Sequence, residues 1–383
     1  MTLAEQLSES AIPLADPEST GGTLTVNLSA IDLNWRTLAR MIVPGECAAV
    51  VKANAYGLGL EPVTTTLANA GCKTFFVADL AEARRVRACT EEAAIYVLNG
   101  FTYEGSSAFV EIRARPVINS MTELAEWDAF VAAHAWLGGA ALHVDTGMNR
   151  LGISAAEAAA LAPRVQMENH GITLLMSHLA CAETPDHPLN ARQIRAFREI
   201  RMLYRGITSS LANSSGIFLG STVFCDLVRP GIALYGANPT PASNNPMRAV
   251  IELKARILQV RTVNRGETVG YGATWTAGRP SRMAIVGLGY ADGFSRSAGA
   301  AKGKAPASMV ISGRRCPIAG RVSMDLVAVD VTELGEGRPR RGDFATVIGN
   351  EMTVDEVAAG MGTIAYEVLT RLGRRYHRVY VGA

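Results

Sequence analysis

Between residues 32 and 236 the chain alternates short apolar, β-prone runs with longer amphipathic segments. Parallel strands joined by crossover helices produce this alternation. The strands are predicted at residues 48–51, 74–78, 94–98, 115–118, 141–144, 173–177, 209–212 and 227–234. Helices are predicted between them at residues 61–70, 80–88, 121–135, 154–168 and 189–204. Eight such units favour an α/β fold of the (β/α)8 barrel type, with a doubly wound sheet as the alternative.

Two local signals refine this prediction. No G-x-G-x-x-G motif opens a helix after the first predicted strand. Its absence weighs against a dinucleotide-binding doubly wound sheet. Ser120 and Ser154 stand directly before helical segments and are predicted to cap their N-termini.

A Pro/Asn-rich link at residues 238–246 marks a change of rhythm. Short predicted strands follow at residues 249–263, 267–274, 283–288, 309–317, 326–331, 344–348 and 376–381, with one helix at 354–372. This pattern predicts a mostly-β domain. The resulting scheme is a disordered leader at 1–22, a strand within 23–31 that joins the C-terminal domain, a barrel at 32–245 and a mostly-β domain at 246–383.

Composition narrows the class of protein. Of 383 residues 48% are hydrophobic, enough for a sizeable core, and the net charge of +2 comes without a Lys/Arg block. Nucleic acid and membranes are therefore not expected partners. The six cysteines are dispersed without a CxxC pair, which predicts reduced thiols and no metal site. The first residues lack the basic-then-apolar order of a signal peptide, so a cytoplasmic location is expected.

Lys52 ends the first predicted strand and is followed by small residues up to Tyr56. Barrel enzymes carry their functional groups at the C-terminal ends of the strands. A desolvated amine at that position would have a lowered pKa and could act as a nucleophile or a base. The alternative interpretation is a surface lysine after a buried strand.

Further candidate site residues follow three other predicted strands and lie within the eighth. Loops after strands seven and eight often bind phosphate in barrels, and a hydroxyl with nearby backbone N–H groups could cradle an anion. Each loop alone could be a plain turn, and a single histidine is more often structural. Together on one rim they predict a phosphate-bearing cofactor. The residues are Arg150 after strand five, His178 after strand six, Ser214 after strand seven, and Arg229, Gly231 and Ile232 in strand eight.

Eight motifs, in order and at similar spacing, resemble those of the alanine racemases over residues 25–380. They are VVKANAYG, HVDTGMNRLG, MSHLA, LANSSG, LVRPGIALYG, VGYGATW, GLGYADG and GRVSMD. The resemblance implies a barrel enzyme that uses pyridoxal 5′-phosphate (PLP) to interconvert L-alanine and D-alanine. It also implies that the enzyme supplies D-alanine for cell-wall peptidoglycan.

The same resemblance implies how the cofactor is bound. Lys52 would form the covalent link to PLP, and its phosphate would be held by Tyr56, Ser214, Gly231 and Ile232. Arg229 would face the pyridine nitrogen and be oriented by His178. Arg150 would reach the phenolic oxygen of the cofactor and the carboxylate of the substrate.

Two bases on opposite faces of the substrate are the economical way to racemise an amino acid. The resemblance assigns these roles to Lys52 and Tyr271. It places Tyr290 and Met324 in a substrate gate that favours alanine. In the family these C-terminal residues enter the site of the other subunit, so a homodimer with shared active sites is implied.

Three positions depart from the family pattern. His143 stands where many members carry a carbamylated lysine, Arg374 where a tyrosine often contacts the phosphate, and Leu58 where a histidine is usual. Without the carbamate, we expect Arg150 to be held by His143, by a bound anion such as chloride, or by both. Activity is then expected to be independent of bicarbonate and to fall as His143 protonates near its reference pKa of about 6.5.

Three alternatives stay open at this point. A broader-specificity racemase of the same fold would resemble secreted proteins with signal peptides, which this chain lacks. A non-catalytic PLP-binding barrel protein would lack the C-terminal β domain and Tyr271. Decarboxylases with a similar barrel lack the C-terminal motifs.

Overall fold

The computed structural model describes residues 20–134, 138–167, 171–299 and 306–382. The chain forms two compact units. One unit is Leu28–Arg248, and the other combines the strand that ends at Asn27 with Ala249–Gly382. Of the leader predicted at 1–22, residues 1–19 lie outside the described residues.

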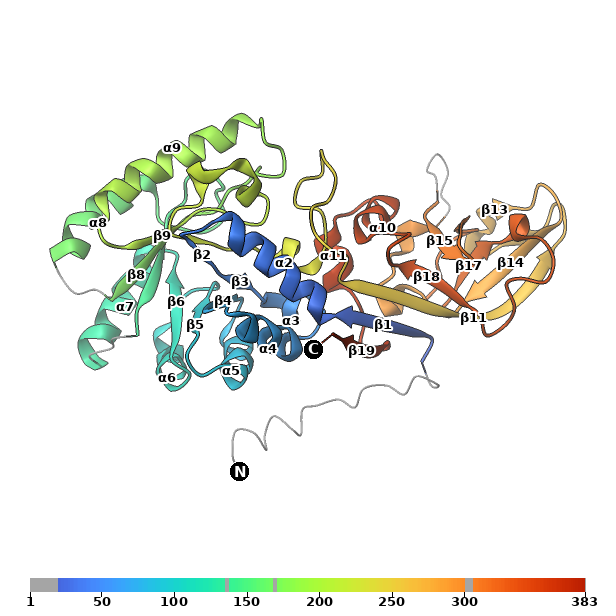
Figure 1. Cartoon of the computed structure of the whole chain (residues 1–383), viewed down its shortest axis with the longest axis horizontal. Helices are drawn as coiled ribbons and strands as arrows, with labels where there is room; N and C mark the ends of the chain where they lie inside the picture. The colour runs from blue at the N-terminus through green and yellow to red at the C-terminus, as the bar shows by residue number, and fades with distance from the viewer. Residues whose placement is uncertain (1–19, 135–137, 168–170, 300–305, 383) are drawn as a thin grey trace, which may run out of the picture. The chain divides into compact units, whose positions relative to one another are not determined.

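Seven parallel strands of the first unit lie side by side in chain order (Figure 1). Their residues are almost all buried, because helices cover the outside and side chains fill the inside. This two-sided burial explains the continuous apolar runs in the sequence. The strands are β3 (Ala49–Val50), β4 (Thr74–Val77), β5 (Ala94–Val97), β6 (Ala114–Ile118), β7 (Ala140–His143), β8 (Ile172–Met176) and β9 (Thr208–Ser210).

The sheet closes through its eighth segment. β10 (Leu227–Val228) pairs in parallel with β2 (Glu46–Cys47), which continues almost directly into β3. On its other side the Arg229 N–H donates to the carbonyl of Ala212 at 2.9 Å, and Asn213 and Arg229 form a parallel bridge. The predicted (β/α)8 barrel is therefore confirmed, and the doubly wound alternative is wrong.

Helices surround this barrel (Figure 1). Both predicted N-caps are confirmed, since Ser120 Oγ accepts the Glu123 N–H at 3.1 Å and Ser154 Oγ accepts the Glu157 N–H at 3.2 Å. The longer helices are α2 (Leu28–Met41), α4 (Leu60–Ala70), α5 (Leu80–Cys89), α7 (Met121–His134), α8 (Ala155–Met167) and α9 (Pro188–Leu203), and a shorter one is α6 (Ser106–Glu111).

The second unit is mostly β, as predicted. β1 (Gly22–Asn27) lies in its main sheet, antiparallel to β11 (Ile251–Val263) and parallel to β19 (His377–Val381). The N-terminal strand is thus held by strands more than 220 residues away. The sheet also contains β14 (Ser281–Val286), β15 (Ser308–Ile311), β16 (Arg314–Pro317), β17 (Val327–Asp330) and β18 (Phe344–Ile348).

Three predicted elements are shorter or divided. The strand predicted at 227–234 ends at Val228, since Pro230 has no N–H to donate and the 3-10 helix η4 (Ile232–Tyr235) follows. The strand predicted at 267–274 is β12 (Thr268–Val269), which precedes the 3-10 turn η5 (Tyr271–Ala273). The helix predicted at 354–372 is two helices, α10 (Val354–Met361) and α11 (Ala365–Thr370), because Gly362 adopts a φ of 73°.

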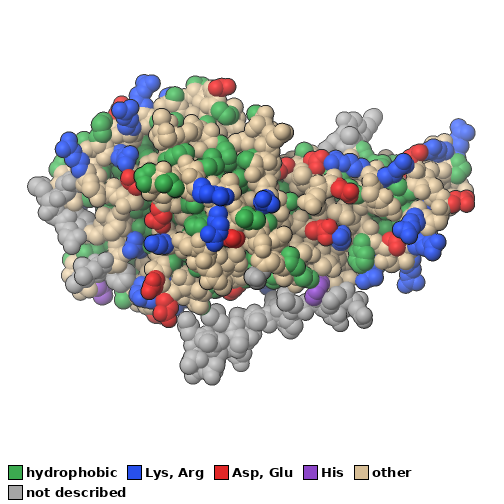
Figure 2. Space-filling view, viewed as in Figure 1, with side chains coloured by type: hydrophobic (Ala, Val, Ile, Leu, Met, Phe, Trp, Pro, Cys, Tyr) green, Lys and Arg blue, Asp and Glu red, His purple; other side chains and the backbone are tan. Residues whose placement is uncertain are grey.

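The surface carries no large single-sign region on the face shown in Figure 2, where acidic and basic side chains are interspersed. No helix among the described residues combines the length and apolarity needed to cross a bilayer. All six cysteines are free thiols.

Candidate functional site

The C-terminal ends of the barrel strands bring most of the predicted site residues to one rim. Lys52 follows β3, His143 ends β7, and His178 follows β8 by two residues. Ser214 follows β9, and Arg229 follows β10. Because all these strands are parallel, residues that lie up to 177 positions apart in the chain (Lys52 to Arg229) share one end of the barrel.

Directly after Lys52 the backbone makes a left-handed turn. Ala53, Asn54, Ala55 and Tyr56 have φ between 52° and 56°, and Gly57 follows at 85°. A run of four non-glycine residues in this region is unusual, because each clashes with its own carbonyl by roughly 1–2 kcal/mol. Such strain persists only where the surroundings hold it, and it concentrates at functional sites.

Side chains of α5 and the Asn54 side chain of the turn itself hold this turn. Glu82, in the first turn of α5, accepts the Asn54 N–H at 2.8 Å and the Ala78 N–H at 3.0 Å. The Asn54 side-chain oxygen accepts the Leu60 N–H at 3.1 Å and an Arg85 N–H at 2.8 Å. Sequence reasoning missed Glu82 and Asn54, although Asn54 lies within the VVKANAYG motif.

The environment of Lys52 favours its neutral amine. Burial, followed by the positive charge of Arg150, lowers the pKa of the Lys52 amine, while Glu82 acts weakly in the opposite direction. A lysine with a lowered pKa is a better nucleophile and base near neutral pH. The structure therefore places the lysine as the sequence predicted, at the end of a buried strand rather than on an open surface.

Ser214 organises a cradle of donors beyond β9 and β10. Its Oγ accepts the N–H of Gly231 at 2.9 Å and that of Ala233 at 3.2 Å. With both lone pairs engaged, the hydroxyl proton is directed away from the protein backbone and can donate to an anion. A Cβ on Gly231 would lie 2.2 Å from the Tyr56 Oη. Only glycine therefore lets the Tyr56 phenol approach this turn.

Tyr56 is itself fixed by packing. Its ring stacks on the ring of Tyr235, with 4.6 Å between centroids, and the Tyr235 hydroxyl donates to the carbonyl of Val50 at 2.9 Å. The cradle thus offers two hydroxyl donors and the backbone of the η4 turn. This donor set fits the oxygens of a phosphate group.

Arg229 is buried at the centre of the rim without a carboxylate partner among the described residues. Its guanidinium donates to Ser210 Oγ and to the Ser177 carbonyl, and it lies over the Phe76 ring at 5.9 Å. Burial lowers the pKa of Arg229 to about 10, so the group keeps its proton at neutral pH and acts only as a donor.

His178 lies between two donors. An Arg229 N–H faces its Nδ1 and the Asn213 amide faces its Nε2, each at 3.5 Å. Burial, then the charges of Arg229 and Arg150, lowers the pKa of His178 well below its ordinary value. The ring is therefore neutral, and the positive charge of this region belongs to the arginines.

His143 is buried and bonds through Nδ1 to the side-chain oxygen of Asn119 at 2.8 Å. Burial, then Arg229 and Arg150, lowers the pKa of His143 to about 4. The expected loss of activity as this ring protonates near pH 6.5 is therefore wrong, because the folded protein keeps it neutral well below that pH. Asn119 follows β6 directly, and its place at a strand end was the signal that could have identified it.

Arg150 lies on an exposed loop shaped by Asp145. Asp145 Oδ1 accepts the N–H groups of Gly147, Met148 and Asn149 at 2.9–3.2 Å. The carboxylate is therefore engaged in loop structure rather than in pairing with the guanidinium.

Tyr271, the second predicted base, lies in the other unit and is 68% exposed. Gly270 and Gly272 flank it with φ of 75° and 72°, conformations that a side chain would strain. A Cβ on Gly272 would lie 2.9 Å from Arg321 Nη1, so Arg321 is the cation packed against this turn.

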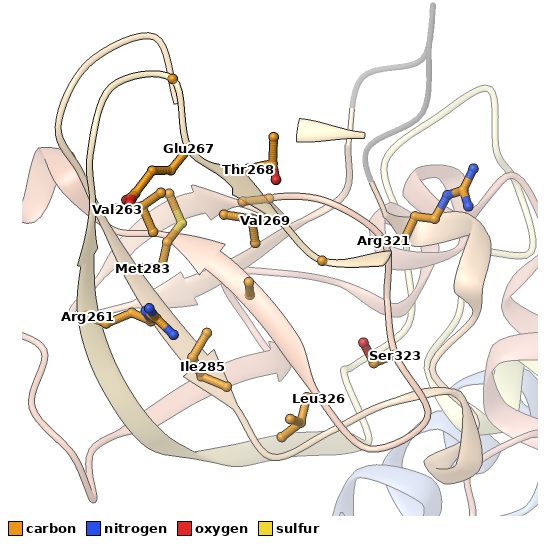
Figure 3. Close-up of a pocket in the computed structure, with 14 residues that line it drawn as sticks. Arg261, Val263, Glu267, Thr268, Val269, Met283, Ile285, Arg321, Ser323 and Leu326 are labelled. Atoms are coloured by element: carbon orange, nitrogen blue, oxygen red, sulfur yellow. The ribbon is translucent and has the colours of Figure 1, made fainter. Parts of the chain in front are cut away.

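Beside this turn the second unit contains a cavity of about 600 Å³ (Figure 3). Val263, Val269, Met283 and Ile285 line it together with Gly270. Arg261, Glu267 and Arg321 also line the cavity, so its walls combine apolar and charged side chains.

Tyr290 and Met324 are brought together by their backbones. The Tyr290 N–H donates to the Ser323 carbonyl at 3.1 Å, and the Ala291 N–H donates to the Met324 carbonyl at 3.0 Å. Both side chains are exposed, Tyr290 by 43% and Met324 by 54%. Arg374 is also exposed, between α11 and β19. No group of three potential metal-ligating side chains gathers in the described part of the chain.

Two family models match almost the whole chain. The model described as "Alanine racemase, N-terminal domain" covers residues 26–239, and "Alanine racemase, C-terminal domain" covers residues 250–380. An alanine racemase of Methylobacterium sp. (strain 4-46) is 50% identical over 361 residues, which is 94% of this chain and 98% of the relative. Catabolic and biosynthetic alanine racemases of Agrobacterium fabrum are each 43% identical, over 94% of this chain and 92% and 94% of theirs.

Solved structures agree with these matches. An alanine racemase from Bartonella henselae with covalently bound pyridoxal phosphate superposes with a TM-score of 0.89 and 38% identity, over 94% of this chain and 99% of that one. The biosynthetic alanine racemase from Pseudomonas aeruginosa gives a TM-score of 0.88 and 37% identity, over 95% of this chain and 100% of that one.

Proposed function

The chain belongs to the alanine racemase family, and we propose that it interconverts L-alanine and D-alanine with PLP bound at Lys52. One observation carries the proposal. A lysine whose amine has a lowered pKa shares a barrel rim with a phosphate cradle and a protonated arginine. A lysine nucleophile, a phosphate site and a partner for the pyridine nitrogen, which can be an arginine, are groups that bind and tune PLP.

The donor set fits the proposed cofactor. Ser214 has its hydroxyl proton free to point outward, because its oxygen already accepts two N–H groups. Tyr56, Gly231 and Ile232 complete the group that would hold the phosphate. Lys52 would hold the cofactor covalently, and Arg229 would donate to the pyridine nitrogen.

When bound, PLP stabilises the negative charge that develops as the α-proton of an amino acid leaves. Lys52 takes or returns this proton on one face of the substrate, and Tyr271 does so on the other. Arg229 keeps its own proton and therefore leaves the pyridine nitrogen unprotonated. A weaker electron sink favours simple proton transfer over transamination and elimination.

The same proposal covers substrate binding and assembly. Arg150 would bind the carboxylate of the substrate, and Tyr290 and Met324 would limit its side chain. Tyr271, Tyr290 and Met324 are all exposed on their own unit. We infer that they complete the site of a second copy in a homodimer.

The physiological role that we propose is the supply of D-alanine for peptidoglycan in the cytoplasm. Sequence identity does not separate this role from a catabolic one, because the two Agrobacterium fabrum relatives are equally similar. The chemistry at the rim is the same for both.

The test begins with the purified protein. We expect a yellow protein whose absorbance band disappears on borohydride reduction, with the cofactor left attached to Lys52. A chiral assay on a panel of L-amino acids then follows. Lys73→Ala, at an exposed lysine of the same unit, is the control for the role assigned to Lys52. A colourless protein that takes up no PLP would overturn the proposal.

A further inference from the structure

Asn119 contacts both the ring of His143 and the loop that carries Arg150. It follows β6 (Ala114–Ile118) and is 4% exposed. Its side chain meets the ring of His143, and its backbone carbonyl accepts the Gly152 N–H at 3.1 Å. Neither contact belongs to the β ladder of the barrel, so the sheet alone does not explain this arrangement.

The orientation of the Asn119 amide is settled by its neighbours. Its Nδ2 donates to the carbonyls of Val117 at 2.8 Å and Leu98 at 3.2 Å. Carbonyl oxygens only accept, so the nitrogen must face them and Oδ1 must face His143. Oδ1 is an acceptor, and the atom opposite it at 2.8 Å, His143 Nδ1, must therefore carry the proton.

This hydrogen bond determines what the other side of the ring offers. A neutral imidazole has one N–H and one lone pair. With the proton on Nδ1, the lone pair of His143 is on Nε2, which becomes an acceptor. The alternative tautomer would place two acceptors opposite each other across 2.8 Å and is disfavoured by the loss of a buried hydrogen bond.

The charges around His143 also oppose a second proton on the ring. Arg229 comes from the end of β10, and Arg150 from the loop after β7. Asp145 is the opposing charge, but its Oδ1 is engaged by three loop N–H groups. Two guanidinium groups against one engaged carboxylate keep the ring a neutral acceptor.

The loop that carries Arg150 closes on the same pair of residues. Beyond Arg150 the chain returns to the barrel, where the Gly152 N–H bonds to Asn119 and the Ile153 N–H bonds to the His143 carbonyl at 2.9 Å. A Cβ on Gly152 would lie 2.7 Å from the Asp145 nitrogen, so this return is tightly packed. Asn119 thus fixes the ring with its side chain and the loop with its backbone.

We propose that Asn119 is a positioning residue, which holds His143 as the Nδ1-protonated tautomer so that Nε2 presents its lone pair as an acceptor in the field of the two guanidinium groups, Arg229 and Arg150. The proposal rests on the proposed function, in which Arg150 binds the substrate carboxylate. It assigns to a pair of neutral side chains the acceptor near these two cations, where a carboxylate would be the ordinary partner.

The tautomer can be measured directly. We would label the histidines of the holoenzyme with 15N and record their ring nitrogen shifts at pH 7, with His143→Gln to identify the signal among six histidines. We expect a protonated Nδ1 and an unprotonated Nε2. A protonated Nε2, or a ring protonated on both nitrogens, would overturn the proposal without any kinetic measurement.

Variants test whether the tautomer matters. Asn119→Ala removes Oδ1 but keeps the backbone carbonyl, so the loop contact survives. We expect a mixture of tautomers and a rise of about threefold to tenfold in KM for alanine, the effect of one ordinary hydrogen bond, with little change in kcat. Asn190→Ala is the matched control, since Asn190 is also buried and bonds to three carbonyls of the loop before α9.

A double-mutant cycle separates positioning from packing. If Asn119 acts through the ring, adding Asn119→Ala to His143→Gln should change KM less than twofold. Independent effects of the two substitutions would overturn the proposal. An enzyme that shows the expected tautomer but no activity on alanine would instead overturn the proposed function and leave the assignment of the ring intact.

Discussion

The barrel rim and the C-terminal unit present their functional groups in opposite ways. On the rim, Arg229 and His143 are buried to 4% and 8% exposure and are held by named hydrogen bonds. In the C-terminal unit, Tyr271 and Met324 are 68% and 54% exposed. The rim side chains are thus fixed in the interior of their unit, whereas the side chains of the C-terminal unit lie on its surface.

This difference indicates how the chemistry is divided. The buried groups set protonation states, since burial lowers the pKa of Lys52 and His143. The exposed groups stand on short turns whose shape depends on glycines such as Gly270 and Gly272. We therefore expect substitutions on the rim to alter cofactor binding and stability, and substitutions in the C-terminal unit to alter turnover and specificity alone.

The largest effect is expected from Tyr271→Phe. Removing the phenolic proton should leave PLP binding intact and slow racemisation by roughly 10²–10⁴, the range for loss of a positioned acid–base group. In deuterated water the variant should still exchange the α-proton of D-alanine faster than that of L-alanine, because Lys52 remains. Tyr103→Phe, at an exposed tyrosine of the barrel unit, is the control. Equal loss of exchange for both enantiomers would contradict the assignment of faces.

Specificity should depend on the exposed gate. The native protein is expected to favour alanine, to use serine poorly and to exclude lysine and arginine. Met324→Ala should raise kcat/KM for a longer amino acid relative to alanine by about tenfold or more, since side-chain fit in a pocket is worth roughly 1–3 kcal/mol. Met202→Ala, at an exposed methionine of α9, provides the comparison. Similar turnover of alanine and lysine by the native protein would favour a broad-specificity enzyme.

Gly231→Ala should damage the rim without touching the C-terminal unit. The new Cβ would lie 2.2 Å from the Tyr56 Oη, so the cradle must shift at a cost of about 1–3 kcal/mol. We expect that cost as weaker PLP affinity, lower stability, or both, measured by cofactor titration and urea unfolding. Gly278→Ala is the control, because its Cβ would meet open space. Unchanged affinity and stability would show that the cradle is not tightly packed.

His143 should make the fold sensitive to acid. Its folded pKa of about 4 lies below the unfolded value of about 6.5, so the unfolded chain binds more protons between these values. The contribution of His143 to the free energy of unfolding is fully present above pH 6.5 and decreases as the pH falls toward 4. Between pH 7 and 5 the native protein should lose about 2 kcal/mol of unfolding free energy that His143→Gln does not lose. His134→Gln, on the surface, should behave like the native protein.

Bicarbonate is expected to have no effect. No carbamate has to form at position 143, where a histidine stands, so activity in carbon-dioxide-free buffer should match activity with added bicarbonate. Activity with and without chloride is the informative comparison, since a bound anion could still offset the charge of Arg150. Recovery of lost activity on adding bicarbonate would mean that another lysine carries the carbamate.

The periodic parts of the fold were predictable. Strands buried on both faces appear as continuous apolar runs. The helix N-caps Ser120 and Ser154 were also predictable, because each bonds to the N–H of a residue only three positions further on. Prediction failed once because of a distant partner and once because of a local glycine. The strand expected at 227–234 ends at Val228, because Ser214 captures the N–H groups of the following turn. The helix expected at 354–372 breaks at Gly362, whose φ of 73° lies outside the helical region.

The sequence by itself determined which chemical groups end the barrel strands, because side-chain identity and the order of strands are both written along the chain. Lys52, Ser214 and Arg229 could therefore be placed on one rim from the sequence alone. Only the tertiary structure decided their protonation and orientation. Those properties depend on burial and on partners far away in sequence, such as Arg229 beside His143 and Asn119 at its Nδ1. A histidine with a reference pKa of about 6.5 becomes a neutral acceptor only once the folded barrel surrounds it.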